Sequence, residues 1–127
     1  MTSLRLRNTA MLFFLALLVA ALASSAAFAA GRVEVGSRVT LGQDYAFHGK
    51  VLSGRDACES NRTVAVYLAR PGADGLYDTT RSNAAGEWEI QAGAPNGDFY
   101  AVAKVRSIDK GTTTLVCKRA ESAVFTF

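Results

Sequence analysis

The clearest strand in the sequence is Thr63-Val64-Ala65-Val66-Tyr67-Leu68-Ala69. Its larger apolar residues Val64, Val66 and Leu68 recur at every second position, which is the period of a strand with one buried face. The segment Pro71-Gly72-Ala73-Asp74-Gly75 then ends the strand, because proline lacks a backbone N–H and glycine tolerates positive φ angles. This strand and its turn are typical of a β-rich fold.

Short runs of the same kind, separated by glycine and asparagine, fill the rest of the chain beyond residue 30. We expect strands at residues 32–41, 45–52, 76–82, 87–91, 99–106, 114–117 and 123–127, and a polar loop at 107–113. The period of an amphipathic helix is absent from these runs. The pattern predicts an all-β fold, a seven- to eight-stranded antiparallel β-sandwich that forms one domain over residues 30–127.

One pair of these runs predicts a hairpin. Residues 76–82 and 87–91 flank the turn-forming sequence Asn83-Ala84-Ala85-Gly86. In the second arm Trp88 and Ile90 alternate with charged or polar residues. A shift by one residue would bury three polar side chains, so we expect this register to be well fixed.

Residues 1–29 have the features of a cleaved signal peptide. Arg5 and Arg7 give a basic start, residues 11–23 are continuously apolar, and Ala27-Phe28-Ala29 is an A-x-A cleavage site. The apolar run would span roughly 20 Å as a helix, short of the roughly 30 Å hydrocarbon core of a bilayer. We therefore expect export and cleavage, and a protein that is secreted or held at the cell envelope. An uncleaved membrane anchor is the alternative.

The charge of the chain excludes one class of partner. The 127 residues include 14 Lys and Arg against 11 Asp and Glu, and Arg5 and Arg7 belong to the leader, so the mature protein is close to neutral. Nucleic-acid binding needs a basic surface well beyond this balance. We expect no nucleic-acid partner, no membrane contact after cleavage, and a monomer.

Cys58 and Cys117 are the only cysteines of the chain. An even pair in an exported protein predicts a disulfide, because the compartment is oxidising. Closing so long a loop stabilises a fold by about 4 kcal/mol in the chain-entropy account. A redox or metal pair is the alternative, but the C-x-x-C spacing and further ligands that it would need are missing.

Four segments together resemble a known family. They are Phe47-His48-Gly49-Lys50-Val51, Arg62-Thr63-Val64-Ala65-Val66, Asn83-Ala84-Ala85-Gly86-Glu87-Trp88-Glu89-Ile90 and Gly97-Asp98-Phe99-Tyr100-Ala101-Val102. Their order resembles the prealbumin-like or carboxypeptidase regulatory-like β-sandwich modules of exported proteins. It is also similar to small single-disulfide secreted proteins of actinobacteria. The resemblance covers about residues 45–127 and implies a non-catalytic, immunoglobulin-like sandwich.

Three relatives of this sandwich do not match. The transthyretin-related hydrolases of purine breakdown use several histidines and a tyrosine-rich tail, whereas this chain has His48 alone and ends in Val124-Phe125-Thr126-Phe127. Pilin-like sandwiches with isopeptide bonds place an asparagine on the last strand, which is absent. Immunoglobulin domains place tryptophan soon after the first cysteine and tyrosine two before the second. Here Trp88 lies far beyond Cys58, and Leu115 occupies the tyrosine position.

His48 is the one histidine that could serve as a catalytic base. Such a base needs a nucleophile or water and an orienting carboxylate. Asp44 and Asp56 are close in sequence, but nothing in the sequence places them in contact with it. We interpret His48 as a surface strand residue and expect no enzyme activity, no catalytic residues and no cofactor. One histidine with two bridged cysteines cannot complete a zinc site, so no metal is expected.

The remaining polar candidates are turn residues. Asp74-Gly75 with Asp78, and Asn96-Gly97-Asp98, could offer oxygens to calcium, but the spacing of a calcium loop is absent. Aspartate and asparagine beside glycine are what turns require. Asn61-Arg62-Thr63 fits the glycosylation acceptor pattern, which matters only in a eukaryotic host.

Aromatic residues are the remaining binding candidates. They are Tyr45, Phe47, Tyr67, Tyr77 and Tyr100. These rings could stack on sugars or contact a protein, and cross-strand packing is the alternative.

The expected function is that of an exported, non-catalytic module that acts by surface binding, adhesion or envelope association. Its partner would be a protein or a cell-envelope polysaccharide. The alternative is a secreted protease inhibitor that presents a rigid loop, Arg70-Pro71-Gly72-Ala73-Asp74.

Overall fold

The computed structural model describes residues 31–91, 93 and 95–127. Its contacts divide the chain into Met1–Gly31 and Arg32–Phe127, and the second unit is described by itself. The predicted signal peptide at residues 1–29 lies outside the described residues. Within the described residues, no helix is long and apolar enough to cross a membrane.

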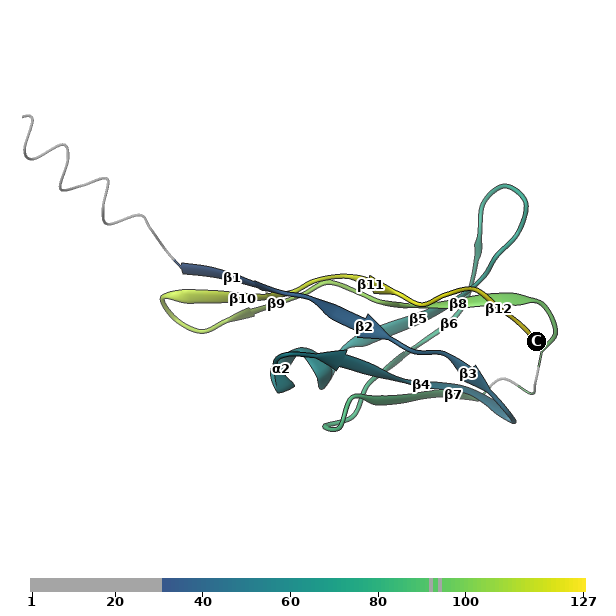
Figure 1. Ribbon diagram of the computed structural model, residues 1–127, viewed down its shortest axis with the longest axis horizontal. Coiled ribbons are helices and arrows are strands. Elements are labelled where there is room, and N and C mark those ends of the chain that lie inside the picture. Colours follow the sequence, from purple (N-terminus) through teal and green to yellow (C-terminus); the bar gives the residue numbers. More distant parts are fainter. Residues whose placement is uncertain (1–30, 92, 94) are drawn as a thin grey trace, which may run out of the picture. The chain divides into compact units, whose positions relative to one another are not determined.

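The described unit consists of strands and one short helix (Figure 1). The elements are β1 (Gly31–Val35), β2 (Ser37–Val39), β3 (Gly42–Gln43), β4 (Ala46–Ser53), α2 (Asp56–Glu59), β5 (Thr63–Leu68), β6 (Gly75–Arg81), β7 (Glu87–Gln91), β8 (Asp98–Ala103), β9 (Arg106–Asp109), β10 (Thr113–Cys117), β11 (Ala120–Glu121) and β12 (Phe125–Thr126). The prediction of an all-β fold is confirmed.

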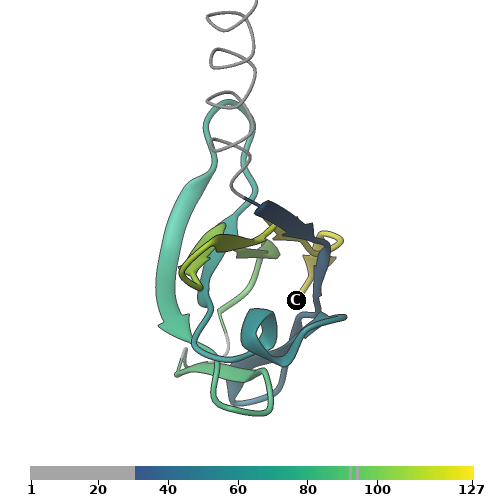
Figure 2. The same ribbon diagram turned by 90° about the vertical axis from the view of Figure 1, so that its left-hand side faces the viewer.

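The strands form three sheets. One has the order β1-β10-β9, and the second has the order β11-β8-β5-β6 with β12 also paired to β8. In the third, β4 pairs with β2 and β3 on one side and with β7 on the other. The following pairs are antiparallel: β9 with β10, β8 with β5, β11 and β12, β4 with β2, β3 and β7, and β5 with β6. Figure 2 shows the described unit from one end, with α2 near its centre.

The predicted hairpin at residues 76–82 and 87–91 is wrong. Strand β6 pairs with β5, whereas β7 pairs with β4, so the turn at Asn83-Ala84-Ala85-Gly86 carries the chain from one sheet to another. The turn itself forms, because Asn83 Oδ1 accepts the backbone N–H groups of Ala85 and Glu87. Gly86 adopts a φ of 80° there, a conformation that glycine accommodates best.

Two smaller predictions also need correction, and one short element was not predicted. The first strand is broken, because β1 ends at Val35 and β2 begins at Ser37 in a different sheet. The predicted polar loop at 107–113 begins as a strand, since β9 covers Arg106–Asp109 and pairs with β10. Helix α2, at Asp56–Glu59, is too short to leave a periodic signal in the sequence.

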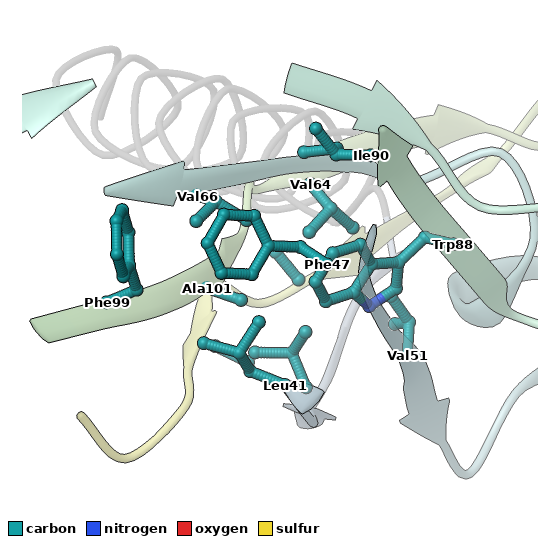
Figure 3. Packing of buried hydrophobic residues seen from close by; sticks show 12 residues of the cluster. Leu41, Phe47, Val51, Val64, Val66, Trp88, Ile90, Phe99 and Ala101 are labelled. Atoms are coloured by element: carbon teal, nitrogen blue, oxygen red, sulfur yellow. The ribbon is translucent and has the colours of Figure 1, made fainter. Parts of the chain in front are cut away.

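The main core joins side chains from two sheets (Figure 3). Phe47 and Val51 from β4 meet Trp88 and Ile90 from β7, and Val64, Val66, Phe99 and Ala101 come from β5 and β8. The register predicted for β7 is confirmed, because Trp88 and Ile90 are buried and their neighbours in the strand are exposed.

Gly49 permits the closest approach inside this core. A Cβ atom at this position would lie 1.9 Å from the carbonyl oxygen of Thr40 and 2.7 Å from Cζ2 of Trp88. Gly49 faces Trp88 across β4 and β7. Glycine is therefore needed for the Thr40 carbonyl group and the Trp88 ring to lie this close to β4.

A smaller core surrounds the disulfide. Cys58 and Cys117 are bonded, with their Cα atoms 5.3 Å apart, and both are fully buried. Leu115 packs beside them, together with the partly buried Val35 and Ile108. The predicted disulfide is confirmed, and it joins α2 to the end of β10.

Arg62 is fully buried next to this second core. Its guanidinium donates to the carbonyl oxygens of Cys58, Lys104 and Lys118, and to Oγ of Ser37, at 2.8–3.1 Å. These five hydrogen bonds use every N–H of the side chain. Burial, with the nearby Arg106, lowers the pKa of Arg62 from its ordinary value.

A polar groove across strand β7 as the candidate functional site

The outward faces of β4 and β7 carry His48 and three charged side chains. His48 lies opposite Glu89, and Lys50 lies opposite Glu87. All four are exposed, because they alternate with the buried residues of the main core. The alternation that buries one face of the sheet therefore fixes the position of these four polar groups on the other face.

Two open hollows meet at β7. One, of about 460 Å³, is lined by Thr40, His48, Gly49, Lys50, Glu87, Trp88 and Glu89. The other, of about 250 Å³, is lined by Thr80, Arg81, Asn83, Glu87, Trp88 and Glu89. The two share three consecutive residues of β7, so they lie next to each other on this strand, and we refer to them together as the β7 groove.

Hydrogen bonds order the residues around the β7 groove. Oγ1 of Thr40 accepts the backbone N–H of Lys50 at 2.9 Å. Nδ2 of Asn83 donates to Glu87 at 3.4 Å, and Nε2 of Gln91 donates to Glu89. The two carboxylates thus each have a partner and keep further acceptor positions for a ligand.

His48 and Asp44 are brought near each other at one end of the β7 groove. Nε2 of His48 lies 3.8 Å from Oδ2 of Asp44, which is an ion-pair distance when the histidine is protonated and longer than a hydrogen bond. Asp44 accepts the backbone N–H of Ala46, and this bond lowers the pKa of the Asp44 carboxyl. Asp56, the second carboxylate considered for His48, lies in α2. This arrangement places an imidazole and a carboxylate where both can bind polar groups.

Trp88 is the only tryptophan of the chain and lines both hollows. The residue is 3% exposed, and its Nε1 is buried without a hydrogen-bond partner among the described residues. Buried donors without a partner are uncommon in folded proteins and cost about 1–3 kcal/mol. The indole N–H is therefore a donor that the fold itself leaves unused.

Of the five aromatic candidates, only Tyr45 is freely exposed. It is 89% exposed and lies in the turn between β3 and β4, next to Asp44. Phe47 is fully buried, and Tyr77 packs edge-on against it with ring centroids 5.4 Å apart. Tyr67 and Tyr100 stack on each other across β5 and β8, with centroids 5.4 Å apart. Packing therefore accounts for four of the five rings.

The candidate inhibitor loop projects from the end of β5 and β6 (Figures 1 and 2). Asp74 orders it, because its carboxylate accepts the backbone N–H of Arg70 at 3.2 Å and the hydroxyl of Tyr100 at 2.5 Å. A Cβ atom on Gly75 would lie 2.6 Å from Nη2 of Arg70, so this guanidinium folds back over its own loop. The Arg70 side chain therefore lies against Gly75 in this structure.

The acidic turns serve the fold. Asp74 holds the loop just described, and Asp98 accepts the hydroxyl of Thr126 at 2.6 Å. Asn61, the glycosylation candidate, has a φ of 52° and accepts a hydrogen bond from Arg81 at 3.1 Å. In the part of the chain that the structure describes, no three His, Cys, Asp or Glu side chains group closely enough to hold a metal ion.

The comparisons with known proteins add no relative. No family model matches the chain, and neither does any curated protein or solved structure.

The sequence does not predict the β7 groove as a unit. It places Asp44 and Asp56 near His48 along the chain, and it places Glu87 and Glu89 on the exposed face of an alternating strand. Thr40 and Arg81 join Glu87 and Glu89 because β4 and β7 pair and because the chain crosses from β6 to β7 at this point. The signal in the sequence is that polar or charged residues alternate with other residues in two segments, which pair as β4 and β7.

Proposed function

We propose that this chain is an exported, non-catalytic β-sandwich module that acts by binding through its surface at the cell envelope. The resemblance to prealbumin-like or carboxypeptidase regulatory-like modules supports the sandwich. So does the main core, in which inward side chains of β4 and β7 meet those of β5 and β8. The basic, apolar and A-x-A segments of residues 1–29 support export, as does the buried disulfide.

The observation that carries the binding role is the β7 groove. Its charged side chains are exposed, whereas the residues between them in β7 are buried in the core. Large polar groups gathered in an open hollow, with an exposed tyrosine at the adjacent turn, are suited to contact a partner. The absence of a histidine–carboxylate hydrogen bond argues against hydrolysis at this site.

Expression of the full chain in a bacterial host, followed by fractionation, tests this proposal. We expect mature protein that begins at Ala30 or Gly31 and that sediments with insoluble envelope material. The matched variant combines Lys50→Ala with Glu89→Gln and should move to the soluble fraction. A control variant, Lys110→Ala with Glu121→Gln, should sediment like the parent. Retention of residues 1–29 would contradict export, and wild-type protein that never sediments would contradict envelope binding.

A further inference from the structure

The shape of the β7 groove points to a chain-like ligand. The two hollows, of about 460 and about 250 Å³, share Glu87, Trp88 and Glu89; Thr40 lines the larger hollow and Thr80 the smaller one. Both are open to solvent. A small molecule is usually enclosed by its site, whereas an extended polymer needs a surface that is open at both ends.

The lining of the β7 groove distinguishes a polysaccharide from a protein. Its exposed side chains are hydroxyl, amide, carboxylate, ammonium, imidazole and guanidinium groups, and Trp88 is 3% exposed. Protein interfaces draw most of their affinity from exposed apolar and aromatic anchors that fill pockets, and the one aromatic residue that lines these hollows, Trp88, is buried. Sugar hydroxyls both donate and accept, so they can pair with carboxylates and with cations alike.

The charges select among polysaccharides. Glu87, Glu89 and the neighbouring Asp44 are acidic, and Lys50 and Arg81 are basic. This balance gives no excess positive field, which a polyanion would require for attraction. An uncharged sugar chain, by contrast, can use both sets of groups.

We propose that the β7 groove binds a hydroxyl-rich polysaccharide that carries no anionic groups. The carboxylates of Glu87 and Glu89 accept sugar hydroxyls, and the ammonium of Lys50 donates to sugar oxygens. Tyr45, at the turn next to Asp44, offers a free ring face for stacking. This inference rests on the proposed function and specifies its ligand.

The sole tryptophan makes this inference directly measurable. The purified chain would be titrated with dextran and with soluble oligomers of N-acetylglucosamine as neutral probes, and with polygalacturonate as an anionic probe. Trp88 emission is the readout, because Trp88 lines both hollows. We expect a saturable change with at least one neutral probe and none with polygalacturonate.

Matched variants locate the site. Lys50→Ala, Glu87→Gln with Glu89→Gln, and Tyr45→Ala should each weaken binding of the neutral probe by about tenfold or more. Glu121→Gln and Lys110→Ala, which change exposed residues outside the β7 groove, should bind as the wild type does. Unfolding midpoints measured for every variant verify that each is folded.

Three outcomes would overturn the inference. They are no emission change with either neutral probe, stronger binding of polygalacturonate, and unchanged affinity in all the groove variants. If the wild type still sediments with envelope material in any of these cases, the proposed function stands and only the ligand class fails. If it neither sediments nor binds a probe, both fail.

Discussion

Arg62 Nη1 donates a hydrogen bond to the carbonyl oxygen of Cys58 at 2.9 Å. The other terminal nitrogen, Nη2, donates to the carbonyl oxygen of Lys118, the residue after Cys117, also at 2.9 Å. The guanidinium therefore joins the same two chain segments that the disulfide joins. The disulfide and the buried Arg62 side chain thus both connect α2 to the end of β10.

Replacing Arg62 should destabilise the fold strongly. Arg62→Met leaves Ser37 and three carbonyl groups without their donor, and we expect a loss of about 3 kcal/mol or more in the free energy of unfolding, because each buried acceptor left unsatisfied costs about 1–3 kcal/mol. Arg62→Lys should also destabilise, because an ammonium cannot reproduce the planar five-donor fork. Urea denaturation measures both variants. The control is Arg119→Ala, an exposed ion-pair partner of Glu121, which should cost less than about 1 kcal/mol. Equal costs for Arg62 and Arg119 would contradict this role.

Gly49→Ala should prevent normal packing of the main core. The added methyl group would meet the Thr40 carbonyl oxygen at 1.9 Å, and backbone cannot move away cheaply. We expect a loss of more than about 3 kcal/mol, beyond the ordinary cost of overpacking. Gly36→Ala is the matched control, because a Cβ there meets nothing within 4 Å. Similar melting temperatures for the two variants would show that the strand contact is misplaced.

Removing the disulfide should cost about 4 kcal/mol, a large share of the stability of a domain of this size. The double variant Cys58→Ala with Cys117→Ala removes the bond, and urea denaturation gives the change in the free energy of unfolding. The unmodified protein should show no free thiol on titration in denaturant without reductant. Two free thiols in that assay would disprove the bond.

The Tyr100–Asp74 hydrogen bond should appear in a pH titration. It raises the pKa of Tyr100 to about 12, chiefly because the Asp74 carboxylate accepts its hydroxyl, and it lowers the pKa of Asp74. Since the folded pKa of Tyr100 is the higher one, its contribution is complete below pH 10 and is lost as the pH rises toward 12. The contribution of Asp74 is present above the ordinary range of the carboxyl and is lost as the pH falls through its lowered pKa.

Absorbance of the phenolate measures this titration. In Asp74→Asn the high-pH step of Tyr100 should shift toward that of an ordinary tyrosine. Tyr100→Phe removes the step and identifies it in the wild type. A wild-type titration in which every tyrosine ionises near pH 10 would contradict the hydrogen bond.

The sequence predicted local structure better than it predicted partners. The register of β7 was predictable, because any shift would bury Glu87 and Glu89 in place of Trp88 and Ile90. The strand that pairs with β7 was not predictable, because a turn such as 83–86 can connect either the two arms of a hairpin or two strands of different sheets. The difference depends on contacts with β4, which lies far away in the sequence.

Arg62 and the β7 groove show the same limit. Arginine is rarely buried, and its burial here depends on carbonyl groups from three separate segments. The β7 groove likewise depends on Thr40, Lys50 and Arg81 from different strands or loops. Composition and alternation place each residue on a face, whereas pairing between distant strands decides which faces meet.

The inward face of β4 and β7 forms the core, and we propose that the outward face binds the neutral polysaccharide. A triple variant of the outward face, Tyr45→Ala with Lys50→Ala and Glu89→Gln, tests it when neutral polysaccharide is titrated against Trp88 emission. We predict an unfolding midpoint like that of the wild type and an affinity weakened by at least about a hundredfold. Unchanged affinity in this folded variant would contradict the claim.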